Sequence, residues 1–347
     1  NGEKYIKKSI SCLINQTLKD IEIICVNDCS KDSSLDIINN FAQNDARITV
    51  IDLKQNVGHS KAKNIAIRQA KADYIMFLDQ DDWYELDACE KSYNKISVNN
   101  NDLVMFDFNF YAENANTYTR DRLRIDVLRE KINDNNIKLY ELDCNFIQSC
   151  WAWCYIYSKK FLIENNICYP EDKHRVDDVQ FIISALVNSE TISIIDEPLY
   201  NHYVNYSSIT YTRPDLWKEY ITTKKDAFTY VLKSKHKNEY LKPYLHWAIC
   251  SGIYWYAIFK CDKKIRKLYY EEMQNWFTQL DNQYHDTIVK ALDSREYRHF
   301  IKICKTSYLK QCIEDILSNI FSIKMPDAHI VITFLGIKLK IRIKGKN

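Results

Sequence analysis

Glycine is scarce in this sequence, and its scarcity limits what the chain can bind through its backbone. Only five of the 347 residues are glycines, and no segment holds several of them within a few residues. A Walker loop or a dinucleotide-binding turn needs such a cluster, so that backbone N–H groups can approach a phosphate. P-loop kinases and NAD-dependent dehydrogenases are therefore excluded. A nucleotide diphosphate bound here would have its charge met by side chains and a metal ion.

Long apolar runs are also missing. No stretch approaches the roughly 20 apolar residues needed to cross a bilayer, and the most aromatic one, Trp247–Phe259, is interrupted by Ser251 and Gly252. That stretch predicts a buried or interfacial helix. No apolar segment typical of a signal peptide follows Asn1–Lys4, so we expect a cytoplasmic protein.

Cysteine is plentiful, but not in the patterns that bind metal. The chain has 12 cysteines and no Cys-x-x-Cys pair. Without a secretion signal, these residues are expected to be reduced thiols. The nearest grouping, Cys150 with Cys154, has no further Cys or His at the spacing of a zinc site. We therefore expect small buried thiols and no structural zinc.

Charge divides the chain into two parts. Residues 1–215 hold 24 Lys and Arg against 33 Asp and Glu, a net charge of −9, whereas residues 216–347 hold 24 against 13, a net charge of +11. This asymmetry predicts that the first part binds cations and that the second meets an anionic partner.

Strand and helix patterns alternate in the first part. We expect strands at 21–26, 48–53, 74–78 and 103–110, and helices at 34–44, 61–70 and 86–98. This alternation predicts an α/β fold whose sheet is parallel or mostly parallel, with helices on both faces. From Trp217 onward the pattern is helical. The period-two pattern at 337–344 predicts a strand that pairs with 330–334 in a terminal hairpin.

Acidic residues follow two of the predicted strands. The third strand leads directly into Asp79, Asp81 and Asp82, and the first leads into Asn27 and Asp28. Crowded carboxylates repel one another unless a cation lies between them, and hard oxygen ligands favour Mg²⁺ or Mn²⁺. Ligands of such sheets bind beyond the carboxyl ends of the strands. The sequence therefore predicts a metal-assisted nucleotide site there.

Four segments, in this order and at these spacings, resemble the signatures of glycosyltransferase family 2: Asn15–Leu18, Val26–Asp32, Asn56–Asn64 and Phe77–Trp83. The resemblance extends to about residue 212, through Trp153, Asp177–Phe181 and Ile195–Tyr200. It implies a GT-A fold over residues 1–215, followed by a helical, basic region at 216–347. It also implies transfer of a sugar, with inversion, from a nucleotide sugar (UDP by default) to an acceptor hydroxyl. Members of the family begin with an apolar strand followed by a turn, and this sequence starts at Asn1, about where that turn would end.

The resemblance assigns roles to particular residues. It implies that Asp28 binds the nucleotide base and that Asp79 contacts the donor and, with Asp81, holds Mn²⁺ or Mg²⁺. Lys63 stands where the family usually has Arg, so it would act as a point charge instead of a bidentate fork. The other residues expected around the donor nucleotide are Asn27, Asn56 and Gly58.

Two further groups of residues complete the expected site. Asp178 matches the catalytic base, while Asp177 replaces the usual Glu, so either member of the pair could carry the reaction. Trp83 and Trp153 are candidates for the sugar or acceptor pocket, with packing in the core as the alternative. His202 is a third candidate, in a loop where many relatives carry an Arg.

The expected partners are a nucleotide-sugar donor and a glycan or lipid-linked glycan acceptor of capsule or lipopolysaccharide synthesis, and no nucleic acid. Two rival functions remain. A sugar nucleotidyltransferase would need a Gly-rich N-terminal loop, and a non-catalytic carbohydrate-binding protein would not need every acidic motif position. The basic residues Lys338, Lys340, Arg342 and Lys344 could rest on the anionic inner face of the cell membrane or protect a solvated edge strand.

Overall fold

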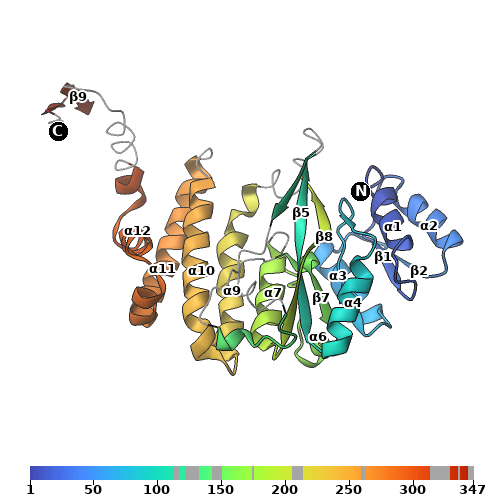
Figure 1. Cartoon of the computed structure of the whole chain (residues 1–347). Helices are drawn as coiled ribbons and strands as arrows, with labels where there is room; N and C mark the ends of the chain where they lie inside the picture. Colours follow the sequence, from blue (N-terminus) through green and yellow to red (C-terminus); the bar gives the residue numbers. More distant parts are fainter. Residues whose placement is uncertain are drawn as a thin grey trace.

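The structure is a computed structural model that describes residues 1–112, 117–121, 133–142, 151–173, 176–204, 214–258, 263–312, 329–334 and 337–342. Figure 1 shows that the main body is laid out in the order of its sequence. The first helices and strands lie at one end, a larger sheet lies in the middle, and helices α9 to α12 follow beside it.

The first layer is a small α/β unit. It contains α1 (Ile6–Ile14), β1 (Ile23–Asn27), α2 (Ser34–Asn44) and β2 (Ile48–Asp52). The two strands pair in parallel from Ile23 opposite Ile48. Ile6 and Ile10 of α1 and Ile38 of α2 form a small core with Ile23 and Ile48. The strands and the helix expected from the sequence here are confirmed, and β1 delivers its carboxyl end to the candidate site.

The larger sheet has the strand order β3, β7, β5, β8, β4, with β6 paired to β5. The strands are β3 (Tyr74–Met76), β4 (Trp83–Tyr84), β5 (Leu103–Ala112), β6 (Thr117–Asp121), β7 (Tyr155–Ser158) and β8 (Ile192–Tyr203). The helices of this part are α3 (His59–Gln69), α4 (Ala88–Asn99), α6 (Lys159–Glu164) and α7 (Asp177–Asn188). Two 3-10 helices, η2 (Leu139–Glu141) and η3 (Ala152–Cys154), lie between them.

The predicted α/β class is confirmed, but the expectation of a mostly parallel sheet is wrong for the larger sheet. Only β5 and β8 pair in parallel, while β7 is antiparallel to both β3 and β5. The prediction assumed that a helix connects each strand to the next one in the sequence. Strand β7 instead starts directly after η3, and its four residues are too short a run to be recognised from periodicity.

Helices make up most of the second part. They are η4 (Pro214–Lys218), α9 (Glu219–Lys233), α10 (Lys237–Ile258), α11 (Lys263–Ala291) and α12 (Ser294–Lys305). The aromatic stretch that begins at Trp247 lies in α10, with Ala248 and Ile249 fully buried. Strands β9 (His329–Phe334) and β10 (Ile337–Arg342) pair antiparallel, which confirms the predicted hairpin.

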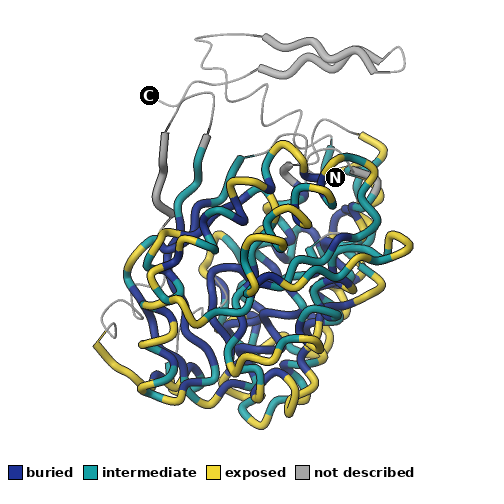
Figure 2. Tube along the Cα trace, turned by 90° about the vertical axis from the view of Figure 1, so that its right-hand side faces the viewer, coloured by how far each residue is buried: buried dark blue, intermediate teal, exposed yellow. Residues whose placement is uncertain are grey.

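Buried residues of the larger sheet and of the helices belong to one continuous hydrophobic core. Figure 2 shows the buried stretches inside the body and the exposed ones on its outer turns. The division at residue 215 falls within η4 and stays a prediction. Among the described residues, no helix combines the length and the apolar character needed to span a membrane.

Candidate active site

The carboxyl end of β1 organises the loop that precedes α3. Both oxygens of the Asp28 carboxylate accept backbone hydrogen bonds, from Val57 N at 2.6 Å and from Gly58 N at 2.9 Å. Gly58 has φ 87°, a left-handed conformation that favours glycine, and α3 begins directly after it. Asn56 donates from Nδ2 to the Asp28 carbonyl at 3.1 Å. Three of the predicted nucleotide residues, Asp28, Asn56 and Gly58, therefore form one local structure.

Asn27 has a different role from its neighbour. Its side chain is buried, donates to Asp52 Oδ1 at 2.8 Å, and accepts a bond from Ser30 N at 3.3 Å. These contacts join the ends of β1 and β2. The side chain of Asn27, like the carboxylate of Asp28, is thus engaged in contacts within the fold.

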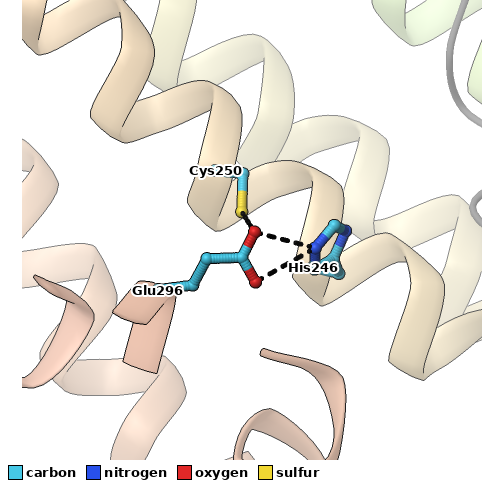
Figure 3. A group of neighbouring side chains, drawn as sticks. All are labelled: His246, Cys250 and Glu296. Carbon is cyan, nitrogen blue, oxygen red and sulfur yellow. Dashed lines mark hydrogen bonds and ion pairs between the residues drawn. The ribbon is translucent and has the colours of Figure 1, made fainter. Parts of the chain in front are cut away.

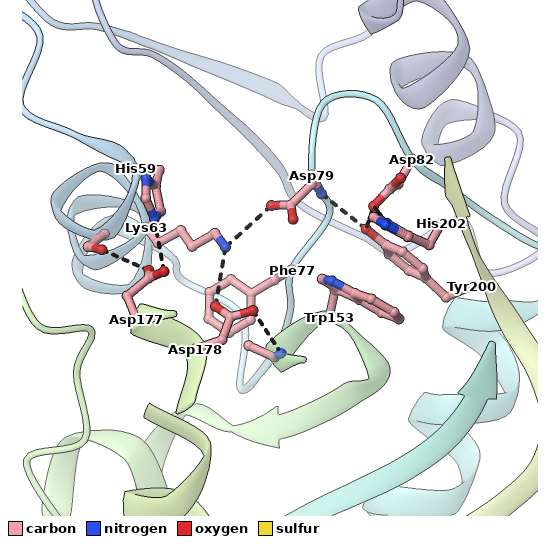
Figure 4. A network of polar contacts seen from close by, with 12 residues as sticks. His59, Lys63, Phe77, Asp79, Asp82, Trp153, Asp177, Asp178, Tyr200 and His202 are labelled. Atoms are coloured by element: carbon pink, nitrogen blue, oxygen red, sulfur yellow. Dashed lines mark hydrogen bonds and ion pairs between the residues drawn. The ribbon is translucent and has the colours of Figure 1, made fainter. Parts of the chain in front are cut away.

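Lys63 connects α3 to two other elements of the site (Figure 4). Its Nζ lies 3.3 Å from Asp79 Oδ1, in the loop after β3, and 3.7 Å from Asp178 Oδ1, in the first turn of α7. Burial alone would lower the pKa of Lys63, but Asp178 and Asp79 raise it well above its usual value. The predicted point charge is therefore a cation held between two carboxylates.

The two adjacent aspartates at the start of α7 have opposite environments. Asp177 accepts a bond from Ser60 Oγ at 2.7 Å and pairs with His59 Nε2 at 2.9 Å. Although burial favours the neutral acid, the bond from His59 and the charge of Lys63 lower the pKa of Asp177 to about 2. The Asp177 carboxylate is thus fully committed to the residues that open α3.

Asp178 is the less satisfied of the pair. Its Oδ2 accepts a bond from Ala152 N at 3.3 Å, while its Oδ1 is buried and has no hydrogen-bond partner among the described residues. Lys63 is too far from Oδ1 for a hydrogen bond but close enough for a charge interaction. Burial raises the pKa of Asp178 to about 6. A carboxylate with one unbonded oxygen and a pKa near neutrality has the properties of a general base.

The backbone is strained directly before this pair. Val176 has φ 58° and ψ 19° at the N-cap of α7. A β-branched residue rarely adopts this left-handed conformation, and it costs about 1–3 kcal/mol. Such strain concentrates at functional sites, and here it sets the entry of the chain into Asp177 and Asp178.

The loop after β3 is anchored through its last aspartate. Asp82 is buried and accepts bonds from Tyr200 OH at 2.5 Å and Tyr203 N at 2.7 Å, with His202 Nδ1 at 3.1 Å. The Tyr200 oxygen in turn accepts a bond from Asp79 N at 3.4 Å. Asp82 therefore fixes the loop to β8. Sequence reasoning missed Tyr200, although its position near His202 in the family-like segment was a usable signal.

Aromatic rings form the wall next to this loop. Trp153 stacks on Tyr200 with ring centroids 4.2 Å apart and planes at 10°, and on His202 at 5.6 Å and 11°. Trp151 in turn stacks on Trp153, with ring centroids 5.5 Å apart. Trp153 is only 3% exposed, whereas Trp151 is 37% exposed. Trp151 is therefore the ring that can meet a ligand, and the Trp-Ala-Trp sequence was the signal for it.

Trp83 lies on the other side of the loop. It is buried in β4, with its ring edge-to-face to Tyr111 and beneath the ammonium of Lys8. Trp83 therefore packs in the core, which was the alternative to a place in the sugar or acceptor pocket. His202 is partly exposed, and although burial lowers the pKa of its imidazole, Asp82, Asp79 and Asp81 raise it overall. Asp81 is half-buried, and its charge reaches this imidazole.

The geometry therefore unites Lys63, Asp79 and Asp178 directly, with Asp28 and Gly58 at the start of the same helix as Lys63. The fold is similar to that of Staphylococcus aureus TarS 1–349, crystallised in complex with UDP-GlcNAc. The TM-score is 0.64 at 17% identity, over 100% of this chain and 97% of that one. The protein thus has an α/β fold of the GT-A type.

Sequence comparisons relate the first part of the chain to glycosyltransferases. The sequence model of "Glycosyl transferase family 2" matches residues 1–164. The uncharacterized glycosyltransferase EpsJ of Bacillus subtilis is 32% identical over 210 residues, 60% of each chain. The poly(ribitol-phosphate) beta-glucosyltransferase of Bacillus spizizenii is 28% identical over 226 residues, 62% of this chain and 33% of that protein. Residues 1–164 are thus similar to glycosyl transferase family 2. It spans 60% of the length of the first two curated relatives it matches.

Proposed function

We propose that the chain is a glycosyltransferase that moves a sugar from a UDP-sugar to an acceptor hydroxyl, with inversion, in the synthesis of a cell-surface polysaccharide. The supporting observation is Asp178, a carboxylate whose buried Oδ1 has no hydrogen-bond partner among the described residues and lies beside Lys63. The family match and the UDP-GlcNAc complex of TarS favour a nucleotide-sugar donor.

Asp178 acts as the base in this proposal. The acceptor oxygen attacks the anomeric carbon as the bond from that carbon to the nucleotide diphosphate breaks, and its proton passes to Asp178 Oδ1. The pKa of about 6 leaves Asp178 ionised at neutral pH, yet basic enough to take a proton in the transition state. Asp177, with its pKa of about 2, is a poor base and keeps α3 and α7 in place.

Lys63 and a metal ion held by Asp79 and Asp81 would stabilise the negative charge of the departing nucleotide diphosphate. Asp79 and Asp81 offer the carboxylate oxygens that Mg²⁺ or Mn²⁺ prefers, and one or two carboxylates with substrate phosphates suffice for such ions. Asp82 is excluded as a ligand because Tyr200, His202 and Tyr203 already use its oxygens. A bound ion would neutralise charge on the departing diphosphate. Lys63, half-buried and cationic, supplies further positive charge at the same place.

The acceptor class is proposed from the relatives and from the aromatic wall. One relative is a poly(ribitol-phosphate) beta-glucosyltransferase, which favours a cell-surface polymer. The exposed ring of Trp151, held by stacking on the buried Trp153, offers a flat apolar surface of the kind on which sugar rings pack. Trp151 is expected to contact the acceptor sugar, because it is the exposed member of this stack.

A donor screen tests the proposal. The chain is incubated with a panel of UDP-, GDP- and TDP-sugars, with and without Mn²⁺, and release of the nucleoside diphosphate is measured. We expect release from a UDP-sugar that Asp178→Asn slows. Once an acceptor is found, the configuration of the new bond is read by NMR, and inversion is expected. No release from any donor, or a product of retained configuration, would contradict the proposal.

Contact of the basic region with an anionic membrane stays a prediction. The β9–β10 pairing is as expected, but Lys344 lies outside the described residues and the side chains of β10 are not described. Membrane contact predicts flotation with anionic but not neutral vesicles, and release by salt. Replacement of Lys338, Lys340, Arg342 and Lys344 by Gln should abolish it. Equal flotation of this variant would favour the edge-strand alternative.

A further inference from the structure

A second cluster of potential ligands lies in the helical region, away from the candidate active site. His246 and Cys250 come from α10, and Glu296 comes from the first turn of α12 (Figure 3). One ligand atom from each residue lies within 4.8 Å of the other two. Within the described part of the chain, this is the one group of three or more such residues that meets this criterion.

The distances from Glu296 to the other two residues match those around a shared ion. His246 Nε2 lies 3.3 Å from both Oε1 and Oε2 of Glu296, and Cys250 Sγ lies 3.5 Å from Oε1. Ligand atoms about 2.0–2.3 Å from a tetrahedral zinc ion lie roughly 3.3–3.7 Å from one another. The imidazole is equidistant from the two oxygens, so Nε2 faces the carboxylate as a whole.

The sequence and the helix ends hold these residues in place. His246 and Cys250 are four residues apart, so they share one face of α10. Glu296 belongs to the capping box of α12, in which its Oε2 accepts a bond from Asp293 N at 2.9 Å. This bond orients the other oxygen, Oε1, toward α10. The carboxylate is therefore positioned by the fold, as the ligands of metal sites usually are.

The cluster is also reachable from solvent. The side chains of His246 and Glu296 are 30% and 31% exposed. Without an ion, burial and the neighbouring Glu296 raise the pKa of the Cys250 thiol to about 12. Metal binding would therefore release the thiol proton to solvent, as binding to cysteine generally does.

We propose that His246, Cys250 and Glu296 form a zinc-binding site that ties α10 to α12, with water in the remaining position. A mixed nitrogen, sulfur and oxygen set suits Zn²⁺ better than Mg²⁺ or Ca²⁺, which prefer oxygen alone. The site is separate from the metal expected at Asp79 and Asp81. It would act on the stability of the helical region, since its ligands come from two different helices, α10 and α12.

Cobalt substitution provides a direct test on the full chain. After treatment with a chelator, the protein is titrated with Co²⁺ and then with Zn²⁺. A Co²⁺–thiolate site gives a charge-transfer band in the near ultraviolet, which one equivalent of Zn²⁺ should remove. Cys250→Ser should abolish the band. Glu296→Gln should weaken Co²⁺ binding by more than about 10–100-fold, the loss usual for a mere supporting residue of a metal site.

The chain offers matched controls. Cys304 is a half-buried cysteine on α12 with a thiol pKa also raised to about 12, and it lies about 12 Å beyond Glu296 along the helix. Cys304→Ser should keep the band. Glu296→Gln retains the amide oxygen needed for the capping box, so its unfolding temperature without metal should stay close to that of the parent.

Three results would overturn the proposal. They are the absence of a Co²⁺–thiolate band, a band that survives Cys250→Ser but not Cys304→Ser, and unchanged Co²⁺ affinity in Glu296→Gln. Each would leave the cluster as a hydrogen-bonded helix cap. Zn²⁺ should also raise the unfolding temperature of the parent and of Cys304→Ser, but not of Cys250→Ser.

Discussion

The two parts of this molecule bury different kinds of side chain. Around the candidate active site several charged residues lie inside the fold: Asp82 and Asp177 are buried, and the side chains of Lys63 and Asp178 are 18% and 17% exposed. Among the described residues of the helical region, the buried side chains are aliphatic and aromatic apart from Thr223, Lys224 and Thr306. Tyrosine hydroxyls there bond to backbone carbonyls, as Tyr270 does with Thr306 O at 2.7 Å. The first arrangement favours chemistry and the second favours stability.

This contrast has an energetic side. Burial raises the pKa of the Asp178 carboxyl from 3.8 to about 6. At neutral pH this carboxyl is ionised although its surroundings favour the neutral acid. Because the folded pKa is the higher one, the associated stability is present at low pH and is lost as the pH rises through about 6. The cost at pH 7 is about 3 kcal/mol. The aromatic packing of the helices, which shares one core with the sheet, offsets such costs.

Among the substitutions that test this contrast between the two parts, we expect the largest effect from replacing Asp178. Asp178→Asn should lower kcat by about 10²–10⁴-fold, the usual share of general base catalysis. It should not lower the unfolding temperature at pH 7, because burial disfavours the charged form of Asp178 more than Lys63 favours it. Initial rates at saturating donor and thermal unfolding measure the two effects. Asp177→Asn is the control and should lose stability with a milder loss of rate. The reverse pattern would transfer the role of base to Asp177.

The next effect belongs to the helical region. Phe277 is fully buried in α11, with its ring 5.3 Å from that of Phe300. Phe277→Ala should lower the free energy of unfolding by about 3–5 kcal/mol through the cavity it leaves. Urea unfolding measures this loss. The folded fraction of Phe277→Ala should bind UDP with unchanged affinity. A loss of UDP affinity alongside the loss of stability would mean that packing in the helical region also affects the candidate active site.

A third effect concerns the loop after β3. Asp81→Asn should weaken Mn²⁺-dependent donor binding by at least about 10–100-fold, because a neutral amide is a poor anchor for the ion. Calorimetric titration of a UDP-sugar with and without Mn²⁺ measures it. Asp82→Asn is the matched change one residue later. It should mainly lower stability, since Asp82 anchors the loop to Tyr200 and Tyr203. Undiminished Mn²⁺ dependence in Asp81→Asn would remove Asp81 from the metal site.

The pH profile gives a smaller and more graded effect. The reaction needs ionised Asp178, so kcat/KM should fall about tenfold per pH unit below about 6 and should level off above it. In Asp178→Asn the residual activity should lose this limb. A limb that persists in the variant would assign the titration to another group, and the candidates in this network are His59, paired with Asp177, and His202, beside Asp82.

Local patterns predicted much of the α/β part. The strand ends that carry Asp28 and Asp79 were identifiable because apolar runs stop there and carboxylates follow. The opposite environments of Asp177 and Asp178 were not identifiable, since they depend on His59, Ser60 and Ala152, which come from other segments of the chain. The same holds for Asp82, whose burial depends on β8.

The antiparallel strand β7 and the His246–Cys250–Glu296 cluster show the same limit. Strand β7 is only four residues long, so a periodic pattern cannot identify it. The cluster joins two helices separated by about fifty residues in the sequence, a distance outside the short spacings used to recognise zinc sites. The expectation of no structural zinc rested on Cys150 and Cys154, and it did not consider pairs that only the packing of helices creates.

The smallest effect tests how tightly the helical region is packed. A Cβ added at Gly252 in α10 would lie 3.1 Å from Phe277 Cζ, closer than ordinary contact. Alanine improves helix propensity by about 1 kcal/mol over glycine, while overpacking a core costs about 1–3 kcal/mol. Because the Phe277 ring is fully buried and packs against Phe300, it has little room to move. Gly252→Ala should therefore lower the free energy of unfolding by about 0–2 kcal/mol.

The sign should reverse when the obstacle is removed. In a Phe277→Leu background, the shorter side chain leaves room for the new methyl group, and Gly252→Ala should then raise the free energy of unfolding by about 1 kcal/mol. A double-mutant cycle in urea, with both single variants and the pair, measures the coupling. Additive effects would mean that Phe277 does not press on α10 and that the helical region is packed more loosely than its buried aromatic rings suggest. Donor hydrolysis should be the same in all four proteins, because neither residue contacts the network around Lys63 and Asp178.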